Sequence, residues 1–320
     1  MNKLSIFDTS VCTENLGDKI IMDSAMEEIR SIFGETFYVH LPTHDKLGFP
    51  SYKHIKNSDF KILCGTNLLS SNMIKYNQWK INLIDTFFLK DVVLLGVGWW
   101  QYQKKPNLYT KFLLKKVLSD NKIHSVRDSY TENQLKSIGI SNVINTSCPT
   151  MWKLTDKHCE DIPKIKGENV LMTLTNYNKN PEHDKKLIDI LNKSYKKVYF
   201  WIQAYEDYLY LKKLNHLNSV VLVDPTLNSL DNILDSKESL DYVGTRLHAG
   251  IRAMNFKRRS IIIAIDNRAT EKSKDFNINI VQRKNIDNKL SDIINSKFNT
   301  DISLPVKNIN KWKSQFKESV

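Results

Sequence analysis

A cation and an imidazole stand close together in the stretch GTRLHAG, where Arg246 and His248 follow a strand-like run that ends at Gly244. If a helix begins here, its free N–H groups and dipole favour an anion, and a guanidinium adds donors suited to phosphate or carboxylate. An imidazole can also give and take protons near neutral pH. The stretch therefore predicts an anion site. In the structural alternative, Arg246 pairs with a carboxylate and His248 caps a turn.

Two further arginines follow predicted strands. Arg127 ends the run HSVR, and Ser129 and Glu132 after it have the spacing of a capping box. Arg268 follows the run SIIIAID. Several arginines at one site suit a ligand with more than one acidic group. The alternative for Arg127 is a surface cluster with Asp128, and Arg268 taken alone is weak evidence.

The turn after the first predicted strand contains Asn15, Gly17 and Asp18. Asp18 is most simply the N-cap of the following helix, and its functional alternative is a carboxylate that takes a proton from an incoming hydroxyl. Trp99 and Trp100 follow another predicted strand. Each can stack on a sugar ring or fill the core, and we expect at least one to do the latter.

Glycines are scarce, and their positions are informative. Gly65, Gly96, Gly98 and Gly244 end predicted strands, where the crevice at the carboxyl ends of parallel strands usually holds a ligand. Neither a dinucleotide fingerprint nor a P-loop occurs. The four cysteines have no zinc or disulfide spacing, so we expect no metal site and a reducing compartment.

The elements that must position these residues alternate between β-branched runs and helical periods, which is typical of an α/β fold. The first-half strands are predicted at LSIFDT, TFYVHL, FKILCG, VVLLGVG, IHSVRD and VINTS. A helix is predicted over 18–33, with Ile21, Ala25, Ile29 and Phe33 on its apolar face.

The alternation restarts after a polar stretch at about 153–167 that we interpret as a linker. The second-half strands are predicted at VLMTLTN, KVYFWIQ, SVVLVD, DYVG, SIIIAID and INIVQ. Helices are predicted from Pro181, through YEDYLYLKKL, near 227–239, near 246–256, over 269–276 and near 286–298.

These elements predict two Rossmann-like domains with mostly parallel sheets facing a cleft. We assign residues 1–155 to an N-terminal domain and 156–320 to a C-terminal domain. Ile309, Trp312 and Phe316 have helical spacing and predict a closing helix in the second domain.

The net charge of +12 favours anionic partners. Basic residues are scattered without a long cationic arm, which argues against nucleic acid. The first apolar run is too short for a signal peptide, and no run is long enough to span a membrane. We expect a cytoplasmic protein and leave open an association with the inner face of the cell membrane. The oligomeric state is not predicted.

Taken together, the motifs resemble the polysaccharide pyruvyl transferase family. The resemblance covers most of residues 4–283 and is carried, in the family's order, by NLGDKIIMDSA, CGTNLL, SVRDSYTENQLKSIGI, GTRLHAGIRAMN and SIIIAIDNRATEKSKDF. It implies a GT-B-like fold and transfer of the pyruvyl group of phosphoenolpyruvate to a sugar of a cell-surface polysaccharide or its precursor. The products are a cyclic ketal and phosphate. The resemblance also implies that residues 1–155 form the acceptor side and residues 156–320 the phosphoenolpyruvate side.

The resemblance also implies roles for individual residues. Phosphoenolpyruvate binding falls to Arg246, Leu247, His248, Arg127 and Arg268, the last standing where many relatives have a lysine. The sugar or lipid-linked glycan acceptor is assigned to Asn15, Gly17, Asn67 and Trp99, and catalysis to His248 and Asp18. No cofactor or metal is implied. The alternatives are a glycosyltransferase that uses a nucleotide sugar and a non-catalytic relative that binds an anion.

Overall fold

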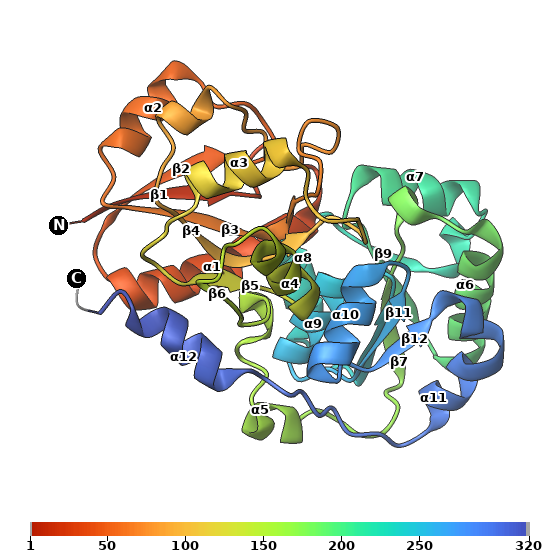
Figure 1. The fold of residues 1–320 in the computed structure, drawn as a ribbon. Helices are drawn as coiled ribbons and strands as arrows, with labels where there is room; N and C mark the ends of the chain where they lie inside the picture. Colours follow the sequence, from red (N-terminus) through yellow and green to blue (C-terminus); the bar gives the residue numbers. More distant parts are fainter. Residues whose placement is uncertain (1, 318–320) are drawn as a thin grey trace. The chain divides into compact units, whose positions relative to one another are not determined.

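The chain divides into two compact units in the computed structural model, which describes residues 2–317 (Figure 1). Unit 1 contains the residues up to Thr13, Ile21–Trp152 and the closing segment from Leu304 on, whereas unit 2 contains Glu14–Ile20 and Lys153–Ser303. The principal division thus lies close to the predicted 155/156 boundary. The closing segment belongs to unit 1, not to the second domain as expected.

Unit 1 is built on a parallel sheet of six strands in the order β2-β1-β3-β4-β5-β6. All six predicted strands of the first half are present, as β1 (Lys3–Asp8), β2 (Phe37–Pro42), β3 (Phe60–Leu69), β4 (Val92–Trp99), β5 (His124–Val126) and β6 (Val143–Asn145). Every residue of β4 is buried, as expected for a central parallel strand covered on both faces.

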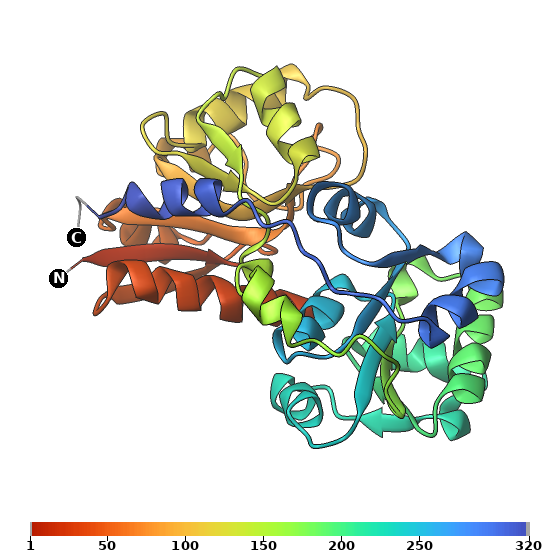
Figure 2. The same cartoon turned by 90° about the horizontal axis from the view of Figure 1, so that it is seen from below.

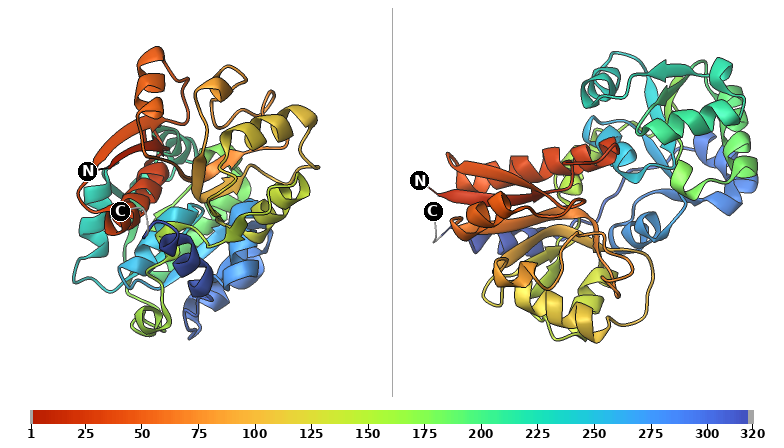
Figure 3. Two further views of the ribbon diagram at one scale, coloured as in Figure 1. Left: turned by 60° about the vertical axis from the view of Figure 1, so that its left-hand side comes forward. Right: turned by 90° about the horizontal axis from the view of Figure 1, so that it is seen from above.

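Helices cover both faces of this sheet (Figure 3). One core holds side chains from α2 (Phe49–Lys56), α3 (Leu108–Val117) and α4 (Ser129–Ser137). The other holds the apolar face of α1 (Leu16–Phe33), and the four residues predicted for that face, Ile21, Ala25, Ile29 and Phe33, are all buried.

The closing helix α12 (Val306–Ser314) packs on the same side as α1 (Figure 2). Trp312 is fully buried, and the ring of Phe316 lies 5.1 Å from that of Phe33. Lys313 pairs with Glu28 of α1. The predicted helical spacing is therefore correct, but its apolar face completes the core of unit 1.

Unit 2 has a second parallel six-stranded sheet, in the order β12-β11-β10-β7-β8-β9. Its strands are β7 (Asn169–Thr173), β8 (Val198–Trp201), β9 (Val221–Val223), β10 (Leu240–Gly244), β11 (Ser260–Ala264) and β12 (Ile280–Gln282). Its helices are α5 (Asp156–Glu160), α6 (Pro181–Ser194), α7 (Tyr205–Lys213), α8 (Leu227–Leu234), α9 (Leu247–Asn255), α10 (Asn267–Phe276) and α11 (Ser291–Asn295).

Two sequence predictions for unit 2 were wrong in detail. The stretch 153–167 is not a plain linker, because it contains α5, whose N-cap Thr155 accepts a hydrogen bond from the His158 N–H. The helix predicted near 286–298 is a π-helical turn, Ile286–Leu290, followed by the short α11.

Each sheet has a point where the strand order reverses direction. It lies between β1 and β3 in unit 1 and between β7 and β10 in unit 2. In open α/β sheets, the crevice at the carboxyl ends of the two strands beside such a point is the usual ligand site. The candidate residues are therefore those that follow β1 and β3, and β7 and β10.

Candidate functional site

Arg246 follows β10, directly at the reversal point of unit 2. Gly244 ends that strand, and a Cβ there would lie 2.5 Å from Thr173 Oγ1 and 2.7 Å from Thr173 N. Only glycine allows β10 to approach β7 this closely. The prediction that Gly244 lets the backbone approach a ligand stays a prediction, because the close approach in the structure is to the neighbouring strand β7.

The backbone of Arg246 is held at both ends. Its N–H donates to Thr173 Oγ1 at 3.3 Å, and the Tyr242 hydroxyl donates to its carbonyl oxygen at 2.7 Å. Arg246 is also the N-cap residue of α9. The predicted location, at the junction of a strand end and a helix N-terminus, is correct.

The Arg246 guanidinium is paired with a buried carboxylate. Its Nε and Nη2 donate to Asp207 Oδ2 at 3.0 and 2.5 Å, and Nε also donates to Leu174 O. Burial raises the pKa of Asp207, and the charge of Arg246 opposes that rise. Arg246 Nη1 has no hydrogen-bond partner among residues 2–317. The structural alternative of a carboxylate partner is therefore realised, and a donor nitrogen is still left for a ligand.

Tyr177 brings a second predicted arginine to the same place. The guanidinium carbon of Arg246 lies 5.4 Å from the centre of the Tyr177 ring, and that of Arg268 lies 5.3 Å from it. Arg268 is the second residue of α10 and is paired with Asp266, whose Oδ2 also accepts from the Tyr177 hydroxyl at 2.9 Å. Two cations predicted from separate motifs thus share one aromatic ring.

Leu247 and His248 form the first turn of α9 and are both buried. The helix packs closely on the sheet, because a Cβ on Gly250 would lie 2.8 Å from the Tyr242 ring and 2.9 Å from Ile262. His248 is therefore fixed by a rigid element beside Arg246. This is where the predicted R-L-H motif places it.

The turn with Asn15, Gly17 and Asp18 belongs to unit 2 and is hydrogen-bonded to Gln203 of that unit. Asn15 Oδ1 accepts from Gly17 N at 3.1 Å and from Gln203 Nε2 at 2.8 Å, while its Nδ2 donates to Asp18 Oδ2. A Cβ on Gly17 would lie 2.6 Å from Gln203 Nε2. Asp18 is not the N-cap: α1 begins at Leu16, and the Asn15 side chain accepts the free N–H instead.

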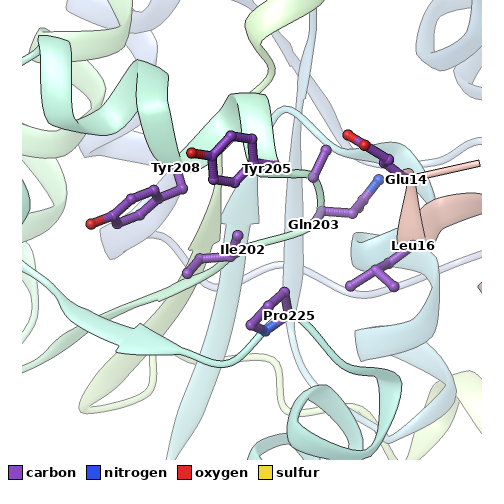
Figure 4. A pocket seen from close by; sticks show the side chains of 8 residues that line it. Glu14, Leu16, Ile202, Gln203, Tyr205, Tyr208 and Pro225 are labelled. Carbon is purple, nitrogen blue, oxygen red and sulfur yellow. The ribbon is translucent and has the colours of Figure 1, made fainter.

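A pocket of about 370 Å³ adjoins this turn (Figure 4). The rings of Tyr205 and Tyr208 lie on one side of it and Glu14 and Leu16 on the other, with Gln203 between. Its lining is completed by Ile202, Ala204 and Pro225. Gln203 Oε1 is buried and has no hydrogen-bond partner among the described residues.

The orientation of the Gln203 amide is set by its neighbours. Asn15 Oδ1 must accept from Gly17 N, so the nitrogen of Gln203, and not its oxygen, faces Asn15. That leaves the Gln203 oxygen as an acceptor beside two aromatic rings. The lining includes a carboxylate but no lysine or arginine, so the pocket suits a neutral, hydroxyl-bearing ligand better than an anion.

In unit 1, Arg127 and Asn67 are in contact. Arg127 is almost fully buried; its Nη2 donates to Asn67 Oδ1, its Nε donates to Asp128 Oδ2 at 3.3 Å, and its Nη1 has no partner in the described chain. Gly98 makes room for it, since a Cβ there would lie 2.1 Å from Arg127 Nε. Arg127 is therefore not the surface residue of the structural alternative.

The backbone before Asn67 is irregular. Thr66 has a φ of +75°, which is rare for a β-branched residue, and the register of β3 against β4 shifts between Thr66 and Leu69. Strained backbone is often kept where function requires it. The predicted capping box after Arg127 was wrong, because Asp128 is the N-cap of α4 and accepts from the Thr131 N–H, while Glu132 Oε2 accepts from Asn145 N.

Trp99 is not available to stack on a sugar. Its side chain is 1% exposed, and its indole N–H is shared between Ser71 Oγ and Gln103 Oε1 at 3.2 Å each. Trp100 instead packs against Tyr76 in a tilted arrangement, with ring centres 4.5 Å apart. The core alternative is correct for Trp99, and we drop it from the acceptor residues.

Arg246, the R-L-H turn and the N-x-G-D turn all lie within a single family match, and Arg268 directly follows it. Residues 15–267 match the family described as polysaccharide pyruvyl transferase. The chain belongs to the polysaccharide pyruvyl transferase family. Membership supports a transferase, as predicted. No match was found among curated proteins.

Solved structures share the fold of this pyruvyl transferase family member. The Methanocaldococcus jannaschii UDP-GlcNAc 2-epimerase in complex with UDP-GlcNAc and UDP is 11% identical, with a TM-score of 0.57 and coverage of 99% of each chain. S. aureus MnaA with UDP is 11% identical, with a TM-score of 0.53 and coverage of 93% of this chain and 92% of that one. The predicted α/β, GT-B-like fold with two mostly parallel sheets is confirmed.

Sequence reasoning missed Tyr177, Asp207 and Gln203. Tyr177 and Gln203 lie shortly after the carboxyl ends of β7 and β8, where the same rule that singled out the glycines would have found them. Asp207 is in the first turn of α7, and nothing in its neighbours indicates that it faces Arg246. The prediction that Arg127 joins the unit 2 cations at one ligand stays a prediction. Within residues 2–317, no helix has the length and apolarity to cross a bilayer.

Proposed function

We propose that this chain transfers the pyruvyl group of phosphoenolpyruvate to a sugar of a cell-surface polysaccharide or its precursor. The observation that carries the proposal is the convergence of Arg246 and Arg268 on Tyr177, beside the first turn of α9. Phosphoenolpyruvate carries a phosphate and a carboxylate. Two guanidiniums and a helix N-terminus offer both groups opposing charge and directed N–H donors.

The donor is held by unit 2 in this proposal. Arg246 contributes Nη1, while its pairing with Asp207 keeps the guanidinium plane fixed. Arg268 contributes a second cation from α10, and Leu247 contributes backbone of the first turn of α9. A role of Arg127 in donor binding is a further prediction, supported by its buried Nη1 without a partner in the described chain.

The reaction forms two C–O bonds at the central carbon of phosphoenolpyruvate and breaks one. Protonation of the methylene carbon creates an oxocarbenium-like centre that one sugar hydroxyl attacks. Phosphate then leaves as a second hydroxyl closes the ketal. One hydroxyl proton replaces the proton given to carbon, and the other leaves with phosphate. No electrons are gained or lost overall, so the reaction needs no redox cofactor, and we propose that it needs no metal.

His248 is the proposed proton donor because an imidazole can be protonated near neutral pH and the first turn of α9 holds it beside Arg246. A second role for a protonated His248 is to stabilise the departing phosphate. Asp18 is the proposed acceptor of a hydroxyl proton. Its carboxylate is buried, and Asn15 fixes its orientation.

The acceptor sugar is assigned to the pocket beside the N-x-G-D turn. Tyr205 and Tyr208 offer aromatic faces to the C–H face of a sugar ring, and Gln203 Oε1 offers an acceptor to a hydroxyl. Asn15 and Gly17 act by fixing the Gln203 amide. The predicted acceptor role of the turn is thus retained in an indirect form, but the pocket lies in unit 2, and most of its lining comes from residues after the predicted acceptor-side domain 1–155. A lipid-linked acceptor and action on the cytoplasmic side of the membrane remain part of the proposal.

Ligand-dependent thermal shift tests the donor. Phosphoenolpyruvate should raise the unfolding temperature of the wild type and have little effect on Arg268→Gln. The matched control is Arg30→Gln, which makes the same change in the exposed last turn of α1. A shift with nucleotide sugars but none with phosphoenolpyruvate would reject the donor assignment and favour a glycosyltransferase.

Turnover tests the chemistry. The protein is incubated with phosphoenolpyruvate and extracted cell-envelope glycan precursors, and pyruvate ketals are sought by mass spectrometry. His248→Gln should keep the phosphoenolpyruvate-dependent thermal shift and lose ketal formation and phosphate release. Unchanged turnover would remove His248 from the mechanism. Loss of activity in a metal chelator would contradict the metal-free reaction.

A further inference from the structure

Unit 1 exposes an unusual number of large apolar side chains on one side. Phe49 is 88% exposed, Phe87 77% and Leu108 85%. Four further exposed apolar residues lie near them in the chain: Leu83, Ile84 and Phe88 around Phe87, and Phe112 one helical turn after Leu108. We call these seven residues the apolar-basic face. Single exposed apolar residues need no explanation, but a cluster of this kind marks an interaction surface.

Contacts connect the three parts of the chain that carry the face. The ring of Tyr52 on α2 stacks on Phe88 with centres 4.5 Å apart and meets Phe49 edge-on at 6.3 Å. The Tyr52 hydroxyl donates to Asp85 in the 3₁₀ helix η1 (Asp85–Phe87), and η1 packs against α3. In Figures 1 and 3, α2 and α3 lie on the same side of the unit 1 sheet, opposite α1 and α12.

The charge of the molecule is concentrated in the same stretch. Residues 46–116 contain twelve lysines, three aspartates and neither arginine nor glutamate, which gives +9 of the chain's +12. One of the three aspartates, Asp85, is buried. Lys53 and Lys56 lie on α2, and Lys111, Lys115 and Lys116 lie on α3, so both helices of the face carry positive charge and no acidic residue.

Helix α3 shows how the two features interleave. Leu108, Lys111, Phe112 and Lys115 are all exposed and stand at i, i+3, i+4 and i+7, so they form one stripe along the helix. The opposite stripe, with Leu113, Leu114 and Val117, is buried in the core. A stripe of alternating apolar and lysine side chains fits the boundary between headgroups and acyl chains, where lysines reach outward to phosphates.

We propose that the apolar-basic face binds the surface of an anionic lipid bilayer. Positive charge matches anionic headgroups, and the protruding phenylalanines and leucines match the acyl layer, whereas a nucleic acid would leave Ile84 and Leu108 unpaired with any apolar group. The face belongs to unit 1 and shares no residue with the donor site or the pocket. The proposal is therefore independent of pyruvyl transfer. Binding to a bilayer would also bring the protein to a lipid-linked acceptor.

The test is flotation of the full-length protein with lipid vesicles. Vesicles of mixed phosphatidylglycerol and phosphatidylcholine should bind the wild type at low salt, whereas vesicles of phosphatidylcholine alone should bind it weakly. The double variant Phe87→Ser/Leu108→Ser should bind at least about tenfold more weakly, because two apolar side chains that would enter the acyl layer are lost. Lys111→Gln/Lys115→Gln should weaken binding and reduce its dependence on salt.

The matched control is Ile165→Ser, which removes an exposed apolar side chain (66% exposed) in unit 2 and should leave vesicle binding unchanged. Each variant is checked for wild-type circular dichroism and for the phosphoenolpyruvate-dependent thermal shift. The proposal is overturned if the wild type does not float with anionic vesicles, or if Phe87→Ser/Leu108→Ser floats as the wild type does. It is also overturned if the face instead forms a dimer that this variant dissociates, with no vesicle binding.

Discussion

Each sheet has a buried arginine at its carboxyl edge, but the two arginines have different partners. Arg246 in unit 2 is paired with the carboxylate of Asp207 and lies near the Tyr177 ring. Arg127 in unit 1 donates to the Asn67 amide and has a longer contact, 3.3 Å, with Asp128. Arg246 thus lies at the reversal point of the unit 2 sheet and is a neutralised cation. Arg127 follows β5, away from the reversal point of the unit 1 sheet, and is only weakly neutralised.

The surroundings of the two edges differ as well. At the unit 1 edge, His40 Nδ1 lies 2.7 Å from Asp8 Oδ2 at the end of β1. Burial works to raise the pKa of Asp8, but hydrogen bonds with His40 and Ser10 outweigh it and hold the pKa below its usual value. Unit 1 therefore offers both signs of charge at its edge, whereas unit 2 gathers two arginines around one tyrosine. In both units the candidate residues lie at the carboxyl ends of the strands. The side chains that pair with each arginine then determine the chemistry that the site can offer.

Removing the partner of each arginine should give the largest difference. Asp207→Asn leaves Arg246 buried without a counter-charge and should lower the free energy of unfolding by about 3–5 kcal/mol. Asn67→Ala should cost about 1–2 kcal/mol, because an amide contributes less than a carboxylate.

The two units can be followed separately in this measurement. Five of the six tryptophans, all but Trp201, lie in unit 1, so tryptophan fluorescence reports mainly on unit 1 and circular dichroism reports on both. In Asp207→Asn, the midpoint of denaturant unfolding should fall when it is followed by circular dichroism and change little when it is followed by tryptophan fluorescence. Equal costs for the two variants would remove the distinction between the arginines.

Gly244 and Gly98 both leave no room for a Cβ, but the neighbouring atoms differ: they include backbone at Gly244 and belong to a side chain at Gly98. In Gly244→Ala the added methyl meets the backbone of β7, which cannot move, and we expect a loss of about 3 kcal/mol. In Gly98→Ala it meets the Arg127 side chain, which can be displaced, and we expect about 1–2 kcal/mol. Denaturant unfolding measures both. A larger loss of unfolding free energy for Gly98→Ala than for Gly244→Ala would mean that the Arg127 side chain cannot be displaced.

Acid should weaken unit 1 through His124. The ring is fully buried; Nε2 faces Ser119 O at 2.9 Å and Nδ1 faces Leu94 N at 3.3 Å, an arrangement that fits the neutral imidazole. Burial lowers the pKa of His124 to about 4. Since this is below the unfolded value of about 6.5, its contribution to stability is present above pH 6.5 and is lost as the pH falls toward 4.

This effect is measured by tryptophan fluorescence in denaturant at pH 7 and pH 5. The wild type should lose about 2 kcal/mol more than His124→Gln between the two values, since glutamine takes up no proton. Parallel losses in the two proteins would show that His124 does not govern the acid sensitivity of unit 1.

The smallest effect is expected at Tyr177. The ring is 55% exposed, so Tyr177→Leu should change the free energy of unfolding by less than about 1 kcal/mol. The affinity for phosphoenolpyruvate should nevertheless fall about fivefold, because both arginines lose the surface that orients them. The control is Tyr102→Leu in unit 1, which is 57% exposed. Unchanged affinity for phosphoenolpyruvate in Tyr177→Leu would show that Arg246 and Arg268 do not need the tyrosine ring for their orientation.

Much of this fold was predictable because it depends on local patterns. β-Branched runs located the twelve strands of the two sheets among the described residues, and the strand-to-helix position of Arg246 followed from a single stretch. What could not be predicted depends on contacts between residues far apart in the chain. The Asp207–Arg246 pair, the fastening of Asn15 to Gln203 and the docking of α12 on unit 1 are examples.

The basic residues illustrate the same limit. Along the sequence, the lysines between 46 and 116 look scattered, and no helical stripe combines all of them. Only the packing of α2, η1 and α3 on one face of the sheet brings the lysines of α2 and α3 to the same side as the exposed phenylalanines. Pattern reasoning along one helix finds the stripe on α3, but not the surface to which it belongs.

The return of α12 to unit 1 has a consequence for the synthesis of the protein. A ribosome makes the six strands of unit 1 first, yet the side of the sheet with α1 stays incomplete until Trp312 and Phe316 have been added, after the whole of unit 2. Such late, long-range closure slows folding and leaves apolar surface exposed meanwhile. The unit that is translated first is therefore the one that matures last, and a nascent chain stalled after unit 2 should depend on chaperones.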